Sequence, residues 1–216
     1  DISIIYQPFG IPVIFHIFGS YIMAKPKIDR KTILKNSLSV FKTKGYSATS
    51  MSDLAQASGL LKGSMYHYIE SKEQLMLEVL NSLMDHYINK VFITAYDEEF
   101  SPYDRLFLLS KKAEEIYIYE DAGNFFANIG LETKNLNRWF NEVIAGFFKK
   151  WINSVEYIYL YVVSREDARA KAESVVAQIE GAVMLMKVMD NASHLRRVLA
   201  GILVEYKELE KENSVK

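Results

Sequence analysis

Apolar side chains recur along most of this chain at the spacing of an α-helix, with turn-forming residues between the repeats. Between Met51 and Ala55 they fall at i, i+3 and i+4, which makes one inward face of a short helix. Gly59 then supplies a turn, because the residue after a helix end often adopts a positive φ that glycine takes without strain. A second short helix, Lys62 to Ile69, is predicted to follow.

Longer helices flank this short pair. Asp29 to Lys44 carries Ile33 and Phe41 on one face and basic residues on the others. Ser71, with Gln74 three residues later, forms a capping box that opens a helix reaching Val91 or beyond. The pattern therefore predicts a three-helix unit followed by a long connecting helix.

The rest of the sequence predicts further helices, so the expected fold class is all-α. The segment Tyr157 to Val163 alternates and has strong β propensity, but no second strand is available to pair with it, and we treat it as a helix end. The expected helical spans are Tyr103 to Tyr119, Gly123 to Leu131, Leu136 to Tyr161, Ser164 to Asp190 and Ala192 to Glu212.

The last two predicted helices each carry an apolar seam whose members are spaced by four and three residues in turn. Two such seams are what antiparallel bundle packing requires, although each could instead pack within its own domain. We assign the pair to a two-fold interface between two copies of the chain. The expected interface residues are Val176, Ile179, Val183, Met186, Leu195, Leu199, Ile202 and Tyr206.

The second short helix has an unusual outward surface. Lys62, Ser64, His67 and Tyr68 offer hydrogen-bond donors and flat rings rather than the mixed charges of a solvated helix. This profile is typical of the recognition helix in a helix-turn-helix, which enters the DNA major groove while the preceding helix crosses the backbone.

About thirty consecutive positions here resemble the DNA-binding signature of the TetR-type (tetracycline-repressor-like) transcriptional regulators. Two positions depart from that pattern: Leu61 stands where the family usually has a capping Ser or Thr, and Ile69 where it usually has Phe. Leucine accepts no capping hydrogen bond, which weakens the helix start by about 1 kcal/mol. The matching blocks are Gly45-Tyr46, Ala48-Thr49, Asp53-Leu54-Ala55, Ala57-Ser58-Gly59-Leu60, Lys62-Gly63-Ser64, Tyr66-His67-Tyr68 and Ser71-Lys72-Glu73-Gln74-Leu75.

The resemblance implies how these residues meet DNA. Phosphate contacts set affinity and base contacts set sequence choice. A homodimer would read a palindromic operator, and the family's usual mode is cytoplasmic repression relieved by a small molecule. The implied DNA-binding residues are Thr49, Ser50, Tyr66 and Lys72 at phosphates, and Lys62, Gly63, Ser64, His67 and Tyr68 at or near base edges.

Charge is divided unevenly along the chain. The net charge of −1 conceals nine Lys or Arg against three acids between Met23 and Lys72, a net of +6. With Asp1 counted separately, the chain after Lys72 carries −6. A basic first third on an acidic body indicates a nucleic-acid module joined to a domain of another kind.

The middle helices are rich in aromatic residues, with a few polar groups on otherwise apolar faces. Any single ring is most simply ordinary core, but the resemblance implies a chamber for a small hydrophobic or ring-containing effector among these helices, and such chambers combine apolar walls with a few polar groups. The expected ligand-binding residues are Phe107, Tyr117, Asn124, Phe125, Phe126, Asn128, Trp139, Phe147 and Trp151.

Enzymatic chemistry finds little support in the sequence. The chain has no cysteine, which excludes disulfides, thiolate metal sites and thiol catalysis. It also lacks a phosphate-binding glycine loop, a His-Glu-x-x-His pair and a nucleophile elbow, and its four histidines are scattered. We expect no enzyme activity, cofactor or metal.

Residues 1–22 differ from the rest because they hold aromatic residues, two prolines and no Lys or Arg. No positive region precedes the apolar run Ile11 to Phe18, so a signal peptide is not expected, and the run is too short for a bilayer span of about 20 residues. We interpret 1–22 as an upstream extension outside the fold, 23–72 as the helix-turn-helix domain and 73–216 as the effector and dimerisation domain, with no membrane partner.

One alternative belongs to a different class. A helical dimerisation or scaffold protein without sequence-specific DNA binding would explain the seams and the aromatic residues. It would leave the basic first third and the surface from Lys62 to Tyr68 without a purpose. Titration against DNA fragments separates the two hypotheses.

Overall fold

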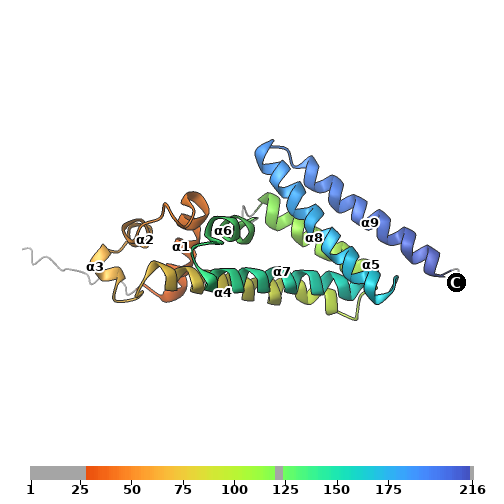
Figure 1. Cartoon of the computed structure of the whole chain (residues 1–216), viewed down its shortest axis with the longest axis horizontal. Coiled ribbons are helices and arrows are strands. Elements are labelled where there is room, and N and C mark those ends of the chain that lie inside the picture. The colour runs from red at the N-terminus through yellow and green to blue at the C-terminus, as the bar shows by residue number, and fades with distance from the viewer. Residues whose placement is uncertain (1–27, 120–123, 215–216) are drawn as a thin grey trace, which may run out of the picture.

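The computed structural model describes residues 28–119 and 124–214 and is helical, with no strand among those residues. A small unit of three helices stands at one end, and two long helices, α4 and α7, run side by side from it into the larger part of the molecule (Figure 1). The remaining helices cover that pair. The all-α prediction is confirmed, and the predicted extension 1–22 lies outside the described residues.

The small unit contains α1 (Arg30–Lys44), α2 (Met51–Ala57) and α3 (Lys62–Met65). Asp29 caps α1 by accepting a hydrogen bond from the Thr32 N–H, and Ser50 with Asp53 forms a complete capping box on α2. The interior of the unit is mainly apolar, although Ser37 is also fully buried there. Its most buried residues are Ile33, Phe41, Leu54, Met65 and Ile69.

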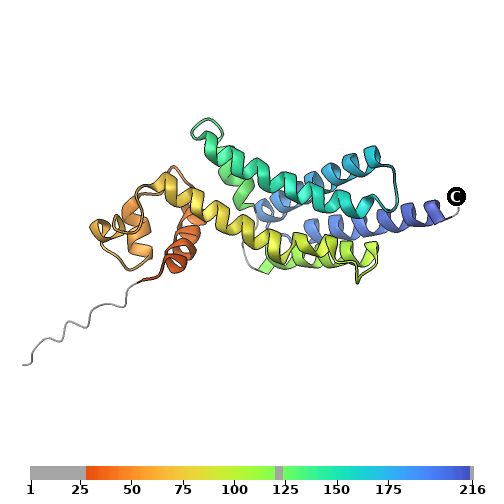
Figure 2. The ribbon, with the colours of Figure 1, turned by 90° about the horizontal axis from the view of Figure 1, so that it is seen from below.

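The helix α4 (Lys72–Lys90) joins the two parts of the molecule. Ser71 caps it as predicted, while the Gln74 side chain accepts from the N–H of Glu70. At about 1.5 Å per residue its 19 residues span about 28 Å. Figure 2 shows α4 leaving the small unit and continuing along the larger one, where the 3₁₀ turn Phe92–Tyr96 follows it.

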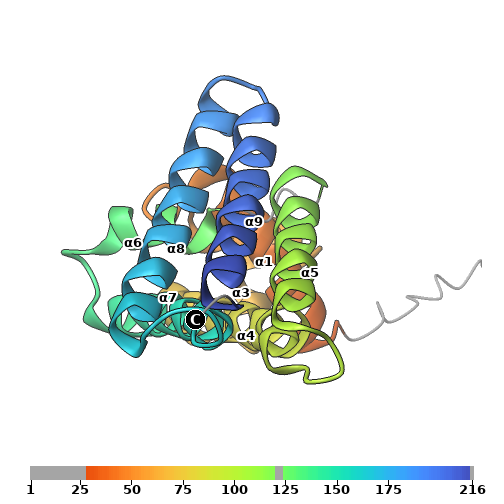
Figure 3. The same ribbon diagram turned by 90° about the vertical axis from the view of Figure 1, so that its right-hand side faces the viewer.

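Among the described residues, the larger part is built from five further α-helices, the 3₁₀ turn η1 and one π-helical turn. Seen end-on in Figure 3, α8 and α9 rise beside α5 above the α4 and α7 layer. The π-helix η2 directly continues α5, and Pro102 occupies the first turn of α5. The elements are α5 (Pro102–Glu114), η2 (Glu115–Tyr119), α6 (Phe125–Thr133), α7 (Arg138–Tyr159), α8 (Arg165–Val188) and α9 (Ser193–Ser214).

The segment with strand-like composition is helical. α7 continues through Tyr157 to Tyr159 and then ends in a turn, so the choice of a helix end over a strand is confirmed. The reason is tertiary: Ile158 and Tyr159 are fully buried, and the Ile158 carbonyl accepts a hydrogen bond from the Tyr206 hydroxyl on α9. Helical packing overrides the local β propensity.

The seams of α8 and α9 need a correction. All eight residues predicted for a two-fold interface are buried within one chain, because the seams face each other and the core formed with α5 and α7. A second copy would have to contact a different face of these helices. The eight residues are Val176, Ile179, Val183, Met186, Leu195, Leu199, Ile202 and Tyr206.

Ser164 provides a direct test of local stability. Its hydroxyl oxygen accepts the Asp167 N–H and so satisfies one of the free donors at the start of α8. We expect Ser164→Ala to lower the free energy of unfolding by about 1 kcal/mol. Ser174→Ala, in the exposed middle of the same helix, should change it little, because alanine is the better helix former there. Urea unfolding of both variants checks the contrast, and equal losses would contradict it.

Candidate nucleic-acid interface and ligand cavity

The α2–turn–α3 unit has the connection that a helix-turn-helix requires. Gly59 has a φ of +66°, and the Leu60 N–H returns to the Ala55 carbonyl at 2.8 Å. A side chain at Gly59 would be strained in this left-handed conformation, so glycine is required for the turn. The turn directs α3 across α2, and the two helices pack closely.

The predicted recognition helix is shorter than expected. α3 has one helical turn, Lys62–Met65, and residues 66–68 continue as a non-helical turn. Leu61 at its N-cap makes no side-chain hydrogen bond, as predicted from its apolar side chain. The side chain is 80% exposed. The segment is held instead by Met65 and Ile69, both fully buried.

The residues proposed for base contact share one outward surface. Lys62, Gly63 and His67 are exposed, and Ser64 and Tyr68 are half-buried. The space above Gly63 is open, because a Cβ built there would meet no atom within 4 Å. This surface is small, donor-rich and accessible, which suits entry into a groove.

The residues proposed for phosphate contact have different environments. Tyr66 and Ser50 are exposed, although the Ser50 hydroxyl is already bonded to Asp53. Thr49 is 2% exposed, and its hydroxyl donates to the Gly45 carbonyl at 2.6 Å. The Thr49 side chain therefore stabilises the loop before α2, and contact between its hydroxyl and DNA would require that bond to be exchanged.

Lys72 also has an internal role that the sequence did not indicate. Its Nζ donates to the carbonyls of Tyr46 at 2.9 Å and Thr49 at 2.8 Å, and it stands 4.3 Å from the centre of the Tyr46 ring. The ammonium group thus ties α4 to the loop between α1 and α2. A phosphate contact by Lys72 stays a prediction, because it would compete with these bonds.

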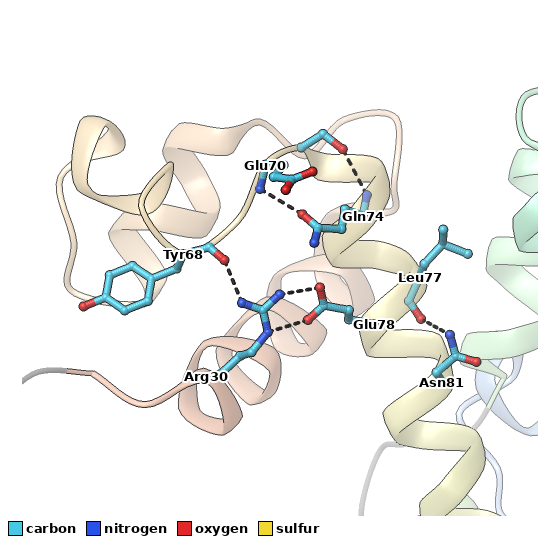
Figure 4. A network of polar contacts seen from close by, with 8 residues as sticks. Arg30, Tyr68, Glu70, Gln74, Leu77, Glu78 and Asn81 are labelled. Carbon is cyan, nitrogen blue, oxygen red and sulfur yellow. Dashed lines mark hydrogen bonds and ion pairs between the residues drawn. The ribbon is translucent and has the colours of Figure 1, made fainter.

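Arg30 connects α1 to α4 and to the turn that follows α3. Its guanidinium forms a two-bond ion pair with Glu78 on α4, at 2.8 and 2.5 Å, and donates to the Tyr68 carbonyl at 2.7 Å. We call residues 62–69 the recognition segment. Figure 4 shows the Arg30 guanidinium between Tyr68 of this segment and Glu78 of α4. The position of Tyr68 is therefore coupled to that of α4 through a charged, bidentate contact.

A second connection joins the small unit to α6. The two carboxylate oxygens of Glu132 accept the backbone N–H groups of Tyr46 at 2.9 Å and Ser47 at 2.6 Å. Burial opposes ionisation of Glu132, but these backbone donors outweigh it and lower its pKa below the usual value. We call this contact the Glu132 clamp. Sequence periodicity gave no signal for it, because it joins residues more than eighty positions apart.

The larger part contains a small apolar cavity of about 40 Å³ among α4, η1, α5, η2, α7, α8 and α9. We call it the closed cavity. Of the nine predicted ligand residues, Tyr117, Phe147 and Trp151 line it. Residues that the sequence did not single out contribute as well, notably Tyr87 and Phe92, and the full lining is Tyr87, Val91, Phe92, Leu106, Leu109, Ser110, Ala113, Ile116, Tyr117, Phe147, Trp151, Val155, Val175, Ile179 and Ile202.

A larger cavity of about 530 Å³ lies between α6, α7 and α8 and opens to solvent. We call it the open cavity. Phe126 is the one predicted ligand residue on its wall. The other lining residues are Ala127, Gly130, Leu131, Lys134, Asn141, Ile144, Ala145, Phe148 and Glu180.

The remaining predicted ligand residues line neither cavity. Trp139 is 58% exposed, Phe107 and Asn128 are also exposed, and Phe125 is buried in the core. Asn124 adopts a left-handed φ of 71° before α6, and its Oδ1 is buried with no hydrogen-bond partner among the described residues. Counting aromatic residues identified the aromatic region but not which rings face a cavity.

Two family models match the chain. Residues 33–79 match the bacterial regulatory proteins of the tetR family, and residues 113–200 match the C-terminal domain of LmrA/YxaF-like transcriptional regulators. The chain belongs to the TetR family. The first match covers most of α1, all of α2 and α3 and the start of α4, and the second covers α6, α7 and α8, which line the open cavity. This TetR-family chain is a DNA-binding regulator of transcription.

Relatives and solved structures agree with this family. The HTH-type transcriptional repressor KstR2 of Mycolicibacterium smegmatis is 30% identical over 124 residues, covering 52% of this chain and 60% of that protein. The repressor DhaR of a Mycobacterium species is 23% identical, covering 79% and 88%. A TetR transcriptional regulator from Legionella pneumophila superposes with a TM-score of 0.73 at 18% identity, covering 82% and 97%, which supports the fold.

No α-helix in the part of this TetR-family chain that the structure describes combines the length and apolar character needed to cross a membrane. Within that part there is also no group of three potential metal-ligating side chains close enough to hold an ion.

Proposed function

We propose that this regulator is a repressor that binds a palindromic operator as a homodimer and leaves it when a small hydrophobic effector binds the larger domain. The proposal rests on the accessible surface of α3, which the buried side chains of Met65 and Ile69 hold in place. The relatives KstR2 and DhaR are named repressors. The protein would act where the chromosome is, in the cytoplasm.

The outward faces of α8 and α9 support dimerisation, although not through the seam residues. Near the end of α8, Leu185 and Val188 are exposed apolar side chains, and Val188 is 80% exposed. Exposed apolar groups that gather on one face favour contact with another protein surface. They adjoin a groove lined by Gln178, Gly181, Ala182, Leu185, His194, Arg197 and Val198.

Two recognition segments are needed because one α3 turn reaches only a few base pairs. A two-fold dimer presents two copies of α3 to two half-sites, so a palindrome follows from the symmetry of the protein. An effector changes DNA affinity only if it binds two arrangements of the dimer with different affinities. Coupling of about 1 to 3 kcal/mol would weaken operator binding about 5- to 150-fold.

Two contacts could carry a change from the larger domain to α3. α4 is tied to the recognition segment by Arg30, and α6 is tied to the loop between α1 and α2 by the Glu132 clamp. Movement of either helix would change the position of the recognition surface. These contacts support the mechanism because both are charged and directional.

The decisive experiment is a gel-shift titration of the full chain against genomic fragments, including the region upstream of its own gene. Selective binding of a few fragments in excess random DNA supports the repressor. Equal, weak binding to all fragments would favour the alternative of a helical scaffold without sequence-specific DNA binding. A reporter gene placed downstream of a selected fragment distinguishes repression from activation, because its expression falls or rises when the regulator is present.

His67 should contribute to sequence choice. We expect His67→Ala to change the ranking of operator variants, with a change of about 1 to 3 kcal/mol at the base pair that His67 contacts. His86→Ala is the matched control, because His86 is exposed on α4 and stands outside the recognition surface. Binding to a library of mutated operators measures both, and an unchanged ranking for His67→Ala would contradict the assignment.

A further inference from the structure

The closed and open cavities are separated by a wall of two paired side chains. Phe147 lines the closed cavity and Phe126 the open one, and their rings stack at 3.9 Å with an angle of 8°. Tyr117 lines the closed cavity and Glu180 the open one, and the Tyr117 hydroxyl donates to Glu180 Oε1 at 3.1 Å. Each pair therefore has one member on each side of the wall.

The sizes of the two cavities restrict where a ligand can bind. A water molecule occupies about 30 Å³ of liquid, so the closed cavity of about 40 Å³ admits little more than water. The open cavity of about 530 Å³ lies within the range of about 300 to 1,000 Å³ that is usual for ligand sites. A ligand therefore fits first in the open cavity, where it contacts one member of each pair.

Among the residues that the structure describes, Glu180 is the one acidic residue on the wall of the open cavity. Burial raises the pKa of its carboxyl group, while the Tyr117 hydroxyl and the charge of Lys187 on the same helix oppose that rise without cancelling it. Lys134, the other charged residue of the lining, is exposed. A half-buried carboxylate in apolar surroundings is costly unless a cation accompanies it.

The aromatic side chains on the wall of the open cavity provide a surface for a flat apolar ring. Phe126, Phe147 and Phe148 form a continuous group of rings, because Phe147 also meets Phe148 edge-on at 5.3 Å. Phe148 lines the open cavity beside Phe126. A flat apolar ring can replace one partner in such a stack with little loss of contact.

We propose that the open cavity binds an aryl-alkyl amine, with its ammonium group paired to Glu180 and its ring against Phe126 and Phe148. This inference rests on the proposed function and adds the chemical class of the effector. The ammonium donates to the carboxylate that now accepts from Tyr117, and the ring displaces Phe126 from Phe147. Because Phe126 and Glu132 are both on α6, displacement of Phe126 acts on the helix that carries the Glu132 clamp.

The test compares phenylhexylamine with the phenylhexanol of the same chain length, which differs only in lacking the cation. Calorimetry with the full-length protein is expected to give at least tenfold tighter binding of the amine. Amine affinity should increase as pH rises toward the pKa of Glu180 in the free protein and level off above it, because the amine binds the ionised carboxylate. The alcohol should show no such rise.

Three variants make the comparison specific. Glu180→Gln keeps an acceptor for Tyr117 and should remove the amine preference and its pH dependence, while alcohol binding persists. Glu173→Gln, an exposed carboxylate on the same helix, should change neither. Ala127→Phe fills the open cavity and should abolish binding of both compounds, with thermal melting used to verify that each variant is folded.

The outcomes separate this inference from the proposed function. Equal affinity of the wild type for amine and alcohol, or a tenfold preference that survives Glu180→Gln, overturns the inference alone. Amine binding unchanged by Ala127→Phe also overturns it, because the site would lie elsewhere. Failure of both compounds to bind the wild type overturns the inference, whereas the proposed repressor is overturned only by the absence of selective DNA binding.

Discussion

Replacing Leu185 and Val188 together with glutamate is expected to produce a folded monomer that has lost high-affinity operator binding. Both side chains are exposed in the single chain, so the carboxylates are solvated before assembly and would be buried without partners in a dimer. Joining two reading units usually raises affinity by about 10²- to 10⁴-fold, and the variant should lose that factor. Sedimentation velocity and gel shift measure the two effects.

Two other substitutions isolate the role of this face. Ile93→Glu changes an exposed apolar residue on the 3₁₀ turn after α4 and should leave both assembly and DNA binding intact. Val183→Glu places a charge in the core between α8 and α9 and should unfold the chain rather than release monomers. A Leu185 and Val188 double variant that remains a dimer would rule out this face as the interface.

Removing the Glu132 carboxylate is expected to uncouple the effector from the operator. Glu132→Ala leaves the Tyr46 and Ser47 N–H groups without their acceptor, so the free energy of unfolding should fall by about 1 to 2 kcal/mol, discounted for partial exposure. Effector binding should then weaken operator binding by less than about 5-fold, the lower limit of typical coupling. Calorimetry of effector with and without operator measures this.

Acidification provides an independent check on the clamp. The pKa of Glu132 is lower in the folded chain than the ordinary value near 4.5. Its contribution to the free energy of unfolding is therefore fully present above pH 4.5. That contribution is lost as pH falls below 4.5 and through the lowered pKa. Wild type and Glu132→Ala should therefore differ in stability at neutral pH and converge in acid. Glu142→Ala, on exposed α7 surface, is the control; a pH-independent difference between wild type and Glu132→Ala would refute the clamp.

Local chemistry predicted a helix start and a turn correctly, although α3 ends four residues earlier than expected. The cap at Ser71, the glycine turn at Gly59 and the missing cap at Leu61 all depend on the residue itself and its next few neighbours. Such signals are short-range, and one sequence contains them fully. The helical class followed from the same evidence.

Partners across space were harder to predict. The spacing of Val183 and Leu199 identifies the buried side of each helix, but a seam filled by the same chain has the same period as one filled by a second copy. Likewise, Lys72 appears as a cation available to DNA in the sequence, whereas the folded chain directs it to two carbonyls. Trp139 and Trp151 are the same residue type in the same predicted helix, yet Trp139 is exposed and Trp151 is buried.

The single-turn recognition segment has an evolutionary consequence. Its order depends on Met65 and Ile69 beneath it, while Lys62, Ser64 and His67 make no contribution to the fully buried core. Mutations at these outer positions can therefore exchange one target sequence for another at little cost in folding, since surface substitutions usually change stability by less than about 0.5 kcal/mol. After gene duplication, one copy can therefore come to recognise a new operator through changes at a few codons, while the fold and the larger domain stay the same.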